Sequence, residues 1–209
     1  MPTLRGRYSA PKKLAKCYKK HCFGNKTVFF HGGSTHLRFG TYADSTEYIQ
    51  AMVDEVGQNG GGWEAASGGS VWITAGTLAG DATINVSGGN GGSNWPRSGG
   101  GGRVAFHQTV ATDFSAWHGT VKAYGGMQAG SGKAAGAGTV YLQSAGQGPT
   151  NATVIVDNGG NPSAGYTEFS RATESDTVGT LIVTNGAALR IPDGETLSVY
   201  GSFLGRTGC

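Results

Sequence analysis

Residues 68–92 read GGSVWITAGTLAGDATINVSGGNGG and contain two short apolar segments, Val71–Ile73 and Thr83–Val86, with glycine runs on both sides. In each segment every second side chain is apolar, so that the apolar side chains share one face. This is the pattern of a half-buried β-strand. The stretch therefore predicts two strands, bounded and joined by glycine-rich connections.

The same pattern recurs along the chain, so the stretch is a repeating unit. Its first strand is repeated at 102–106, 138–142 and 179–183, and its second strand at 120–125, 153–157 and 196–201. Copies of the first strand are 33, 36 and 41 residues apart, and such irregular spacing places the insertions in loops. Stacked repeats bury apolar side chains that one repeat cannot cover by itself.

The residues predicted to point inward form two columns of like side chains. The first column holds Val71/Ile73, Val104/Phe106, Val140/Leu142 and Leu181/Val183, and the second holds Ile84/Val86, Val121/Ala123, Val154/Val156 and Leu197/Val199. These columns predict an all-β fold: a β-solenoid, in the form of a right-handed parallel β-helix, with about four coils over residues 60–209. A β-sandwich is the alternative, because short strands with frequent turn signals also fit it.

Glycine is the compositional outlier, with 39 of the 209 residues. A solenoid corner needs one or two glycines, whereas residues 57–69, 88–102 and 125–138 hold longer runs. We expect these runs to project from one side of the stack as flexible loops, because ordering glycine is entropically costly. The alternative is that they lie against each other as extended polyglycine strands.

Residues 1–59 form a separate, basic N-terminal region in this interpretation. Residues 1–38 carry nine Lys or Arg and no acid, whereas residues 39–209 carry seven Lys or Arg and thirteen acids. We expect a solvated arm, and the alternative is polyanion binding through Lys12–Lys26.

One short helix is predicted at Tyr42–Val56, where Tyr48, Ile49, Met52, Val53 and Val56 share one face. This helix would cover the open end of the first coil.

Cysteine usage and metal-ligand spacing argue against a metal site or cofactor. The three cysteines, Cys17, Cys22 and Cys209, do not make a disulfide scaffold. Cys17 and Cys22 with His31 and His36 are suitable zinc ligands, but the gap between the pairs is short, and Gly32-Gly33 opposes a helix between the histidines. We expect no metal and no cofactor.

No segment has the length of a membrane span, and the basic N-terminus lacks the apolar run of a signal peptide. The chain is then either intracellular or, as we expect, an internal piece of a longer secreted protein.

Polysaccharide-cleaving β-helices need clustered carboxylates, and residues 65–160 hold only Asp81, Asp113 and Asp157, far apart in sequence. We therefore predict that the protein is not an enzyme. Aromatic and short polar side chains on the outer face would suit sugar rings, and they could equally pack under the glycine-rich loops. The candidate ligand-binding residues are Trp72, Asn85, Tyr124 and Tyr141.

Residues 60–204 resemble the glycine-rich repeats of bacterial surface and secreted proteins. The motifs that carry the resemblance are the glycine-bounded strands described above and the tail GTLIVTNGAALRIPDGETLSVYGSF at 179–203, which is similar to adhesin and autotransporter-passenger β-helices. The resemblance implies an extracellular or cell-surface right-handed β-helix with a structural or adhesive role. Its partners would be surface glycans or neighbouring copies of the same protein, and a carbohydrate-binding or polysaccharide-cleaving β-helix is the alternative function.

Overall fold

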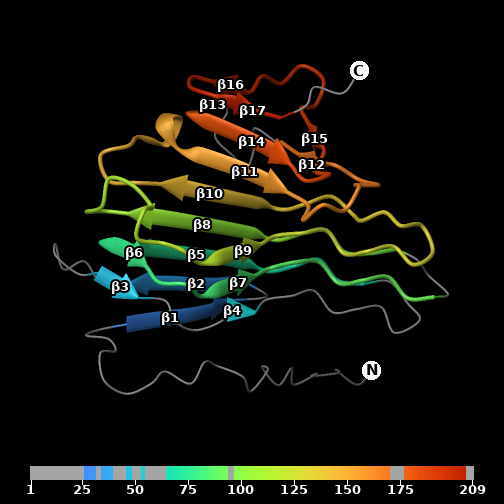
Figure 1. Ribbon diagram of the computed structural model, residues 1–209, viewed down its shortest axis with the longest axis horizontal. Helices are drawn as coiled ribbons and strands as arrows, with labels where there is room; N and C mark the ends of the chain where they lie inside the picture. The colour runs from blue at the N-terminus through green and yellow to red at the C-terminus, as the bar shows by residue number, and fades with distance from the viewer. Residues whose placement is uncertain are drawn as a thin grey trace, which may run out of the picture.

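The computed structural model describes residues 26–31, 34–39, 46–48, 53–54, 65–93, 97–169 and 177–205, with side chains from residue 65 onward. Within these ranges the regular structure is entirely β-strand apart from one short 3-10 helix, η1 (Pro149–Asn151), so the protein is all-β (Figure 1). The strands are β1 (Lys26–His31), β2 (Ser34–Phe39), β3 (Thr46–Tyr48), β4 (Val53–Asp54), β5 (Ser70–Ala75), β6 (Thr77–Ala79), β7 (Thr83–Asn85), β8 (Arg103–Gln108), β9 (Thr120–Lys122), β10 (Thr139–Gln143), β11 (Thr153–Asp157), β12 (Thr167–Glu168), β13 (Thr177–Val178), β14 (Thr180–Thr184), β15 (Leu189–Arg190), β16 (Ser198–Val199) and β17 (Phe203–Leu204).

A main sheet of eight strands runs through the molecule in the order β1-β2-β5-β8-β10-β11-β14-β17 (Figure 1). Neighbouring strands are parallel except at two places, β1–β2 and β10–β11, where they are antiparallel. The predicted repeats pair in register, so that Val71 lies beside Val104 and Val104 lies beside Val140. The first predicted column is therefore a real column across β5, β8 and β10.

Burial confirms which face of these strands points inward. Val71, Ile73, Val104, Phe106 and Val140 are buried in one cluster, and Leu142 packs against it. The second strands close this core from the other side through Ile84 and Val86, which have no exposed surface. Fully burying such a side chain stabilises the fold by about 1.5–3 kcal/mol, so the column is the main source of stability here.

The second strands form a smaller sheet in the order β4-β7-β9, in which Ile84 lies beside Val121. The sequence assigned residues 153–157 and 196–201 to this set, and both assignments are wrong. Residues 153–157 are β11 of the main sheet, and Ser198–Val199 pairs with Thr177–Val178 instead.

Strand direction reverses between β10 and β11, and the buried face of the sheet changes there. Ile155 lies opposite Val140 and packs against the N-terminal core. Its neighbour Val156 points to the other face and is fully buried, and Leu181 on β14 shares that other face and is also buried. We call β2, β5, β8 and β10 with their return strands the N-terminal stack, and β11, β14 and β17 with theirs the C-terminal stack.

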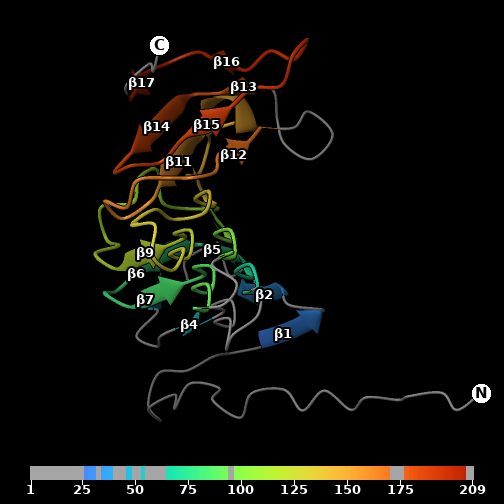
Figure 2. The same cartoon turned by 90° about the vertical axis from the view of Figure 1, so that its right-hand side faces the viewer.

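Figure 2 shows the change of face directly. The return strands β6, β7 and β9 lie on one side of the main sheet, whereas β12 and β15 lie on the opposite side (Figure 2). Crossovers between parallel strands strongly prefer one hand. After the β10–β11 reversal the strands of the main sheet run in the opposite direction, while new strands are still added at the same edge. The crossover connections then keep the same hand only if they pass over the opposite face of the sheet. The reversal at β10–β11 thus accounts for two cores on opposite faces of one sheet.

The helix predicted at Tyr42–Val56 is wrong wherever the structure describes it. Thr46–Tyr48 and Val53–Asp54 are strands, paired in parallel with β6 and β7. Backbone pairing with the next repeat has overridden a local helical periodicity. These strands add a further repeat to the stack, because β2 pairs in parallel with β5 and Ser34 lies beside Ser70.

Two strands of the predicted N-terminal region, β1 and β2, therefore belong to the main sheet. The basic segment Lys12–Lys26 lies outside the described residues apart from Lys26. Polyanion binding by this arm and the domain boundary at residue 59 stay predictions.

Most of the described glycines in these runs are packed against neighbouring segments, so the predicted flexible loops are wrong for them and the extended alternative is confirmed. Gly130 and Gly132 differ, because they lie in an exposed turn where an added Cβ would meet no atom within 4 Å. The Gly99 N–H donates to the carbonyl of Gly89 at 3.0 Å, and the Gly126 N–H donates to the carbonyl of Gly99 at 2.9 Å. The Gly89 N–H in turn donates to the carbonyl of Ala66 at 2.9 Å. Extended segments thus bond in several directions, and we call 65–69, 86–91, 97–102, 123–128 and 134–138 the glycine bundle.

Close approach of backbones, rather than positive φ, explains why these positions are glycine. A Cβ on Gly138 would lie 1.7 Å from the carbonyl oxygen of Gly102, and one on Gly102 would lie 1.9 Å from that of Gly69. No side chain fits at such a position. In Figure 1 these segments extend to the right of the main sheet, one above another.

Candidate functional site

The outer face of the N-terminal stack carries a ladder of aromatic rings on β5, β8 and β10. Trp72 and Tyr141 were predicted to lie on this face, and the structure places His107 between them. The ring centroids of Trp72 and His107 are 4.7 Å apart with planes only 3° from parallel, and those of His107 and Tyr141 are 5.3 Å apart. We call these three side chains the aromatic ladder.

Strand register brings the ladder together. Trp72 lies beside Ala105, which lies beside Tyr141, while His107 lies one diagonal step along, beside Thr74. Ala105 is small, so the rings on either side lean over it toward His107. His107 was not among the predicted site residues, because only Ala105 was assigned to the outer face in that repeat. Period-2 alternation in Arg103–Gln108 carries the signal, since it also places His107 on the outer face.

The polar side-chain atoms of Trp72 and Tyr141 are already hydrogen bonded within the protein. The Trp72 indole N–H donates to Thr74 Oγ1 at 3.1 Å, and the Tyr141 hydroxyl donates to Gln143 Oε1 at 3.0 Å. The Gln143 amide then donates to the carbonyl of Gln147 at 2.7 Å. These bonds hold Trp72 and Tyr141 in fixed orientations.

Partial burial shifts the titration of two ladder groups. Burial lowers the pKa of the His107 imidazole below its usual value of 6.5, because the charged form loses hydration. Burial also raises the pKa of the Tyr141 phenol. At neutral pH both groups are therefore neutral, and the ladder presents a polar but uncharged surface.

The ring orientation limits what the ladder can bind. Rings that are parallel at 4.7 Å, close to the spacing of neighbouring strands, cover each other's faces. His107 is enclosed between Trp72 and Tyr141. Sugar recognition by stacking needs an open ring face. The other face of Trp72 is turned toward β2, where His36 lies beside Trp72 in the register, and Trp72 keeps 46 % of its surface exposed. The exposed part of Trp72, together with the ring edges, is what the ladder offers to a ligand.

Asn85 and Tyr124 lie apart from the ladder, on the sheet of the second strands. Asn85 Oδ1 accepts a hydrogen bond from the Ser87 N–H at 3.2 Å, and Ser87 Oγ accepts one from the Tyr124 N–H at 3.3 Å. The Tyr124 ring packs over Gly159, where a Cβ would lie 2.8 Å from Tyr124 Cε2. Burial, and then the nearby Asp157 carboxylate, raises the pKa of the Tyr124 phenol. The four predicted site residues therefore form two separate pairs.

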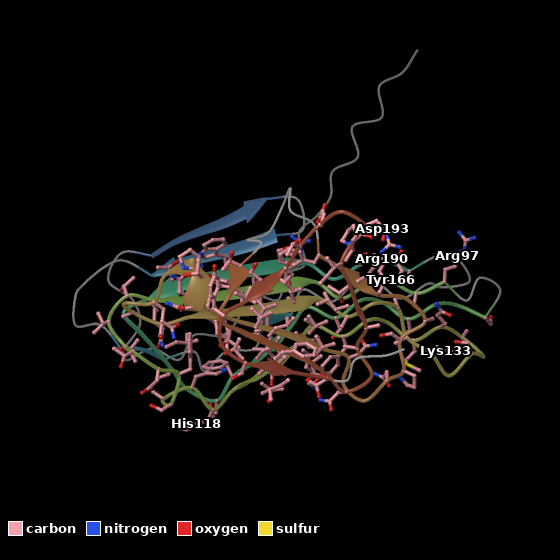
Figure 3. All side chains as sticks on the ribbon, turned by 90° about the horizontal axis from the view of Figure 1, so that it is seen from above. Arg97, His118, Lys133, Tyr166, Arg190 and Asp193 are labelled. Carbon is pink, nitrogen blue, oxygen red and sulfur yellow. The ribbon has the colours of Figure 1, made fainter. Side chains whose placement is uncertain are left out.

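A second cluster of charged and aromatic side chains lies on the C-terminal stack. Arg190 of β15 forms an ion pair with Glu168 of β12, directly across the strands. The Arg190 guanidinium also lies over the Tyr166 ring, 4.2 Å from its centroid, and the two side chains are adjacent in Figure 3. The ion pair is half exposed, and its contribution to stability is about 0–1 kcal/mol.

Over the residues with described side chains, no group of three His, Cys, Asp or Glu side chains is placed to hold a metal ion. The candidate zinc ligands Cys17 and Cys22 lie outside the described residues, and the side chains of His31 and His36 are not described. In the part of the chain that the structure covers, no helix combines the length and hydropathy needed to cross a membrane.

Comparison with known proteins gives no relative on which to base a function. No protein-family model matches the sequence, and searches of curated proteins and of solved structures give no significant match. The function must therefore be argued from the geometry.

Proposed function

We propose that the protein is a non-catalytic structural or adhesive module, built as a β-solenoid and displayed outside the cell or on its surface. The observation that carries the proposal is the in-register column Val71–Val104–Val140, reinforced by the glycine bundle beside it. Within the N-terminal stack, these two features join each repeat to the next, through side-chain packing in the column and through backbone hydrogen bonds in the glycine bundle. Such an arrangement resists deformation along the stack and offers long outer faces to partners.

The packed glycines support a structural role in particular. Ordering the backbone of one residue costs about 1–2 kcal/mol, and glycine is the most expensive residue to order. In the glycine bundle, the contacts between neighbouring segments are made mainly by peptide groups and not by side chains. This construction suits rigidity, and it leaves few side chains available for chemistry.

Amide hydrogen exchange tests the structural role. We expect the backbone amides of Gly99, Gly102 and Gly126 to exchange with solvent as slowly as those of the buried strand residue Val104, because all four are hydrogen bonded. The measurement is amide hydrogen exchange by NMR on the full chain. Fast exchange at these glycines, with slow exchange at Val104, would contradict a rigid glycine bundle and with it the proposal.

The adhesive role has its own test, and the aromatic ladder supplies a second candidate function, carbohydrate binding. Its support is the exposed Trp72 ring on β5, together with the hydroxyl of Tyr141 and the amide of Gln143 on β10 of the same face. Because the facing rings cover each other, we expect a ligand to contact the exposed part of Trp72 and not a flat platform of three rings.

A glycan array with a turnover assay distinguishes these functions. Carbohydrate binding predicts retention on at least one glycan without cleavage, at least tenfold weaker in Trp72→Ala and nearly unchanged in the matched variant Tyr200→Ala, which alters another exposed aromatic residue. Retention without cleavage that both variants keep would support adhesion through another face. Glycan cleavage would overturn the non-catalytic proposal, and an absence of retention would remove the carbohydrate-binding candidate.

A further inference from the structure

The top of the N-terminal core is open, because the chain changes face before covering it. In this stack each return strand lies above the previous one, from β4 to β7 to β9. After β10 the chain enters β11 and returns on the opposite face. Among the described strands none follows β9 in its sheet. In the part of the chain that the structure describes, the next position in this layer, directly above β9, therefore holds no strand.

A cavity of about 240 Å³ lies at this vacant position, and we call it the end cleft. Its walls are mostly apolar and include Phe114, Trp117, Val121, Leu142 and Ile155. The ring of Trp117 is held edge-on against Phe106, with centroids 5.6 Å apart. These side chains are only partly buried and pack against the core from its rim. An apolar side chain inserted here would extend the column formed by Ile84 and Val121.

The β9 strand beside the end cleft also has a free backbone edge within the described structure. The Thr120 N–H donates to the Ala82 carbonyl at 3.0 Å, and the Lys122 carbonyl accepts from the Val86 N–H at 2.7 Å. Parallel pairing alternates, so Thr120 and Lys122 face β7 while the N–H and C=O of Val121 point to the vacant side. An edge of this kind is a template for another strand.

The end cleft contains one charged residue, Asp157, at the end nearest Ala123. The antiparallel register of β10 and β11 pairs Val140 with Ile155, and continuing it by two residues places Asp157 opposite Gly138. The Gly138 N–H in turn donates to the Ala123 carbonyl at 2.6 Å. Asp157 shares a face with Ile155, and its carboxylate lines the apolar cleft. A basic side chain that follows the inserted apolar one would complement this charge.

We propose that the end cleft binds an extended peptide segment of a partner protein, which adds to β9 as a parallel strand. The segment places a β-branched or aromatic residue in line with Val121 and a Lys or Arg in line with Ala123, two residues later. Main-chain hydrogen bonds to Val121 supply affinity, and the cleft and Asp157 supply specificity. The segment thus occupies the place that a further return strand of this chain would take. The surface is distinct from the aromatic ladder, which lies on the opposite face of the main sheet.

The test uses the full chain and the synthetic peptide acetyl-GTITKYG-amide, titrated while backbone amide signals are followed by NMR. We expect saturable shifts at Val121, Gly119 and Leu142. In parallel pairing the N–H of the second threonine of the peptide donates to the Val121 carbonyl, whereas the isoleucine N–H points away. N-methylation at that threonine should weaken binding about tenfold or more, and N-methylation at isoleucine, the matched control, should leave it within about twofold.

A double-mutant cycle tests the charge pairing without disturbing the fold. Asp157→Asn keeps an oxygen to accept the Gly159 N–H, which Asp157 Oδ1 now accepts at 2.7 Å. We expect this variant to bind the lysine peptide about fivefold or more weakly and a norleucine peptide as well as the native protein does. Asp193→Asn, an exposed acid on the C-terminal stack, serves as the control and should change neither.

Three results would overturn the proposal. One is an absence of shifts at Val121 up to millimolar peptide, and another is equal weakening by both N-methyl groups, since neither fits a strand added to β9. The third is a protein that is already dimeric, with Val121 protected and released on dilution. That result would mean that a second copy of this chain, not a foreign segment, occupies the cleft.

Discussion

The N-terminal and C-terminal stacks both bury apolar side chains against the main sheet, but they do so on its opposite faces. The N-terminal stack buries Phe106 and its neighbours on one face and has the glycine bundle beside it. The C-terminal stack buries Val156 and Leu181 on the other face and uses glycines mainly at turns, such as Gly186 and Gly194 with positive φ. The comparison teaches that strand pairing can pass unbroken through a sheet whose core has changed sides.

The largest effect is expected from emptying the N-terminal core. Phe106→Ala removes a ring that is 1 % exposed and that contacts Phe114 and Trp117. It should lower the free energy of unfolding by about 3–5 kcal/mol. Leu181→Ala, the matched change in the C-terminal stack, should cost about 2–4 kcal/mol. Urea denaturation followed by tryptophan fluorescence measures both, and a cost below 1 kcal/mol for Phe106→Ala would refute the assigned core.

The next largest effect is expected at the close-packed glycines of the bundle, which should be more costly to substitute than the turn glycines of the C-terminal stack. Gly138→Ala places a Cβ against the backbone of Gly102 and should destabilise by about 3 kcal/mol, since backbone must move. Gly194→Ala meets no atom within 4 Å, although its φ is +81°. It should cost only about 1–2 kcal/mol from local strain. Thermal melts by circular dichroism compare the two variants, and equal costs would show that φ, and not close approach, explains the glycines of the bundle.

Asn158 links the two stacks and is the position at which to separate them. It is fully buried, its Oδ1 accepts from the Gly125 N–H at 2.8 Å, and its Nδ2 donates to Ser163 Oγ at 2.8 Å. Asn158→Ala leaves the Gly125 N–H unpaired and should cost about 2 kcal/mol. We also expect the single unfolding transition to broaden or split in calorimetry. The variant Asn161→Ala, on a more exposed neighbour, is the control and should keep one sharp transition.

A smaller effect should appear on acidification of the N-terminal stack. The pKa of His107 is lowered in the folded protein, so the unfolded chain binds its proton first as the pH falls. Stability is therefore unaffected by His107 well above pH 6.5, and it declines as the pH falls from there to the folded pKa. His107→Phe should remove this part of the pH dependence. Urea midpoints between pH 8 and pH 5 make the comparison, and identical profiles would count against a neutral, stacked His107.

The smallest effect is expected at the ion pair of the C-terminal stack. Glu168→Gln keeps the shape of the side chain and removes its charge, and the exposed pair contributes about 0–1 kcal/mol. We expect a change below about 0.5 kcal/mol that vanishes in high salt. A larger change would show that Arg190, which also covers Tyr166, depends on Glu168 for its position.

How much of this could be predicted from the sequence depends on whether the deciding signal is local. Period-2 alternation is local, so Val71, Ile73, Val104 and Phe106 were correctly predicted to point inward. The change of face is not local. Its trace is the run Val154-Ile155-Val156, apolar on both faces, which is typical of a strand covered on both sides. Read only as a copy of the second strand, the run does not reveal its place in the main sheet.

The glycine runs and the site illustrate the same limit. Entropy alone favours projecting loops, and only the positions of neighbouring segments show that the peptide groups can satisfy one another. Trp72 and Tyr141 were predicted from alternation, whereas their contact with His107 depends on the register of three strands. The same alternation predicted that Asn85 and Tyr124 lie on an outer face. A single sequence does not show that this face belongs to the sheet of the second strands and lies apart from the face that carries Trp72 and Tyr141.

The glycine bundle has a thermodynamic consequence. Unfolding usually exposes much hydrocarbon, which raises the heat capacity by about 12–15 cal/mol/K per residue, whereas exposing peptide groups lowers it. Segments such as 98–102 bury mainly peptide groups, and 134–138 adds only the small side chains of Ala134 and Ala137. Their unfolding therefore adds little heat capacity, and the stability curve of the protein is flatter than that of an ordinary domain of its length. We therefore expect its free energy of unfolding to change little between low and moderate temperatures.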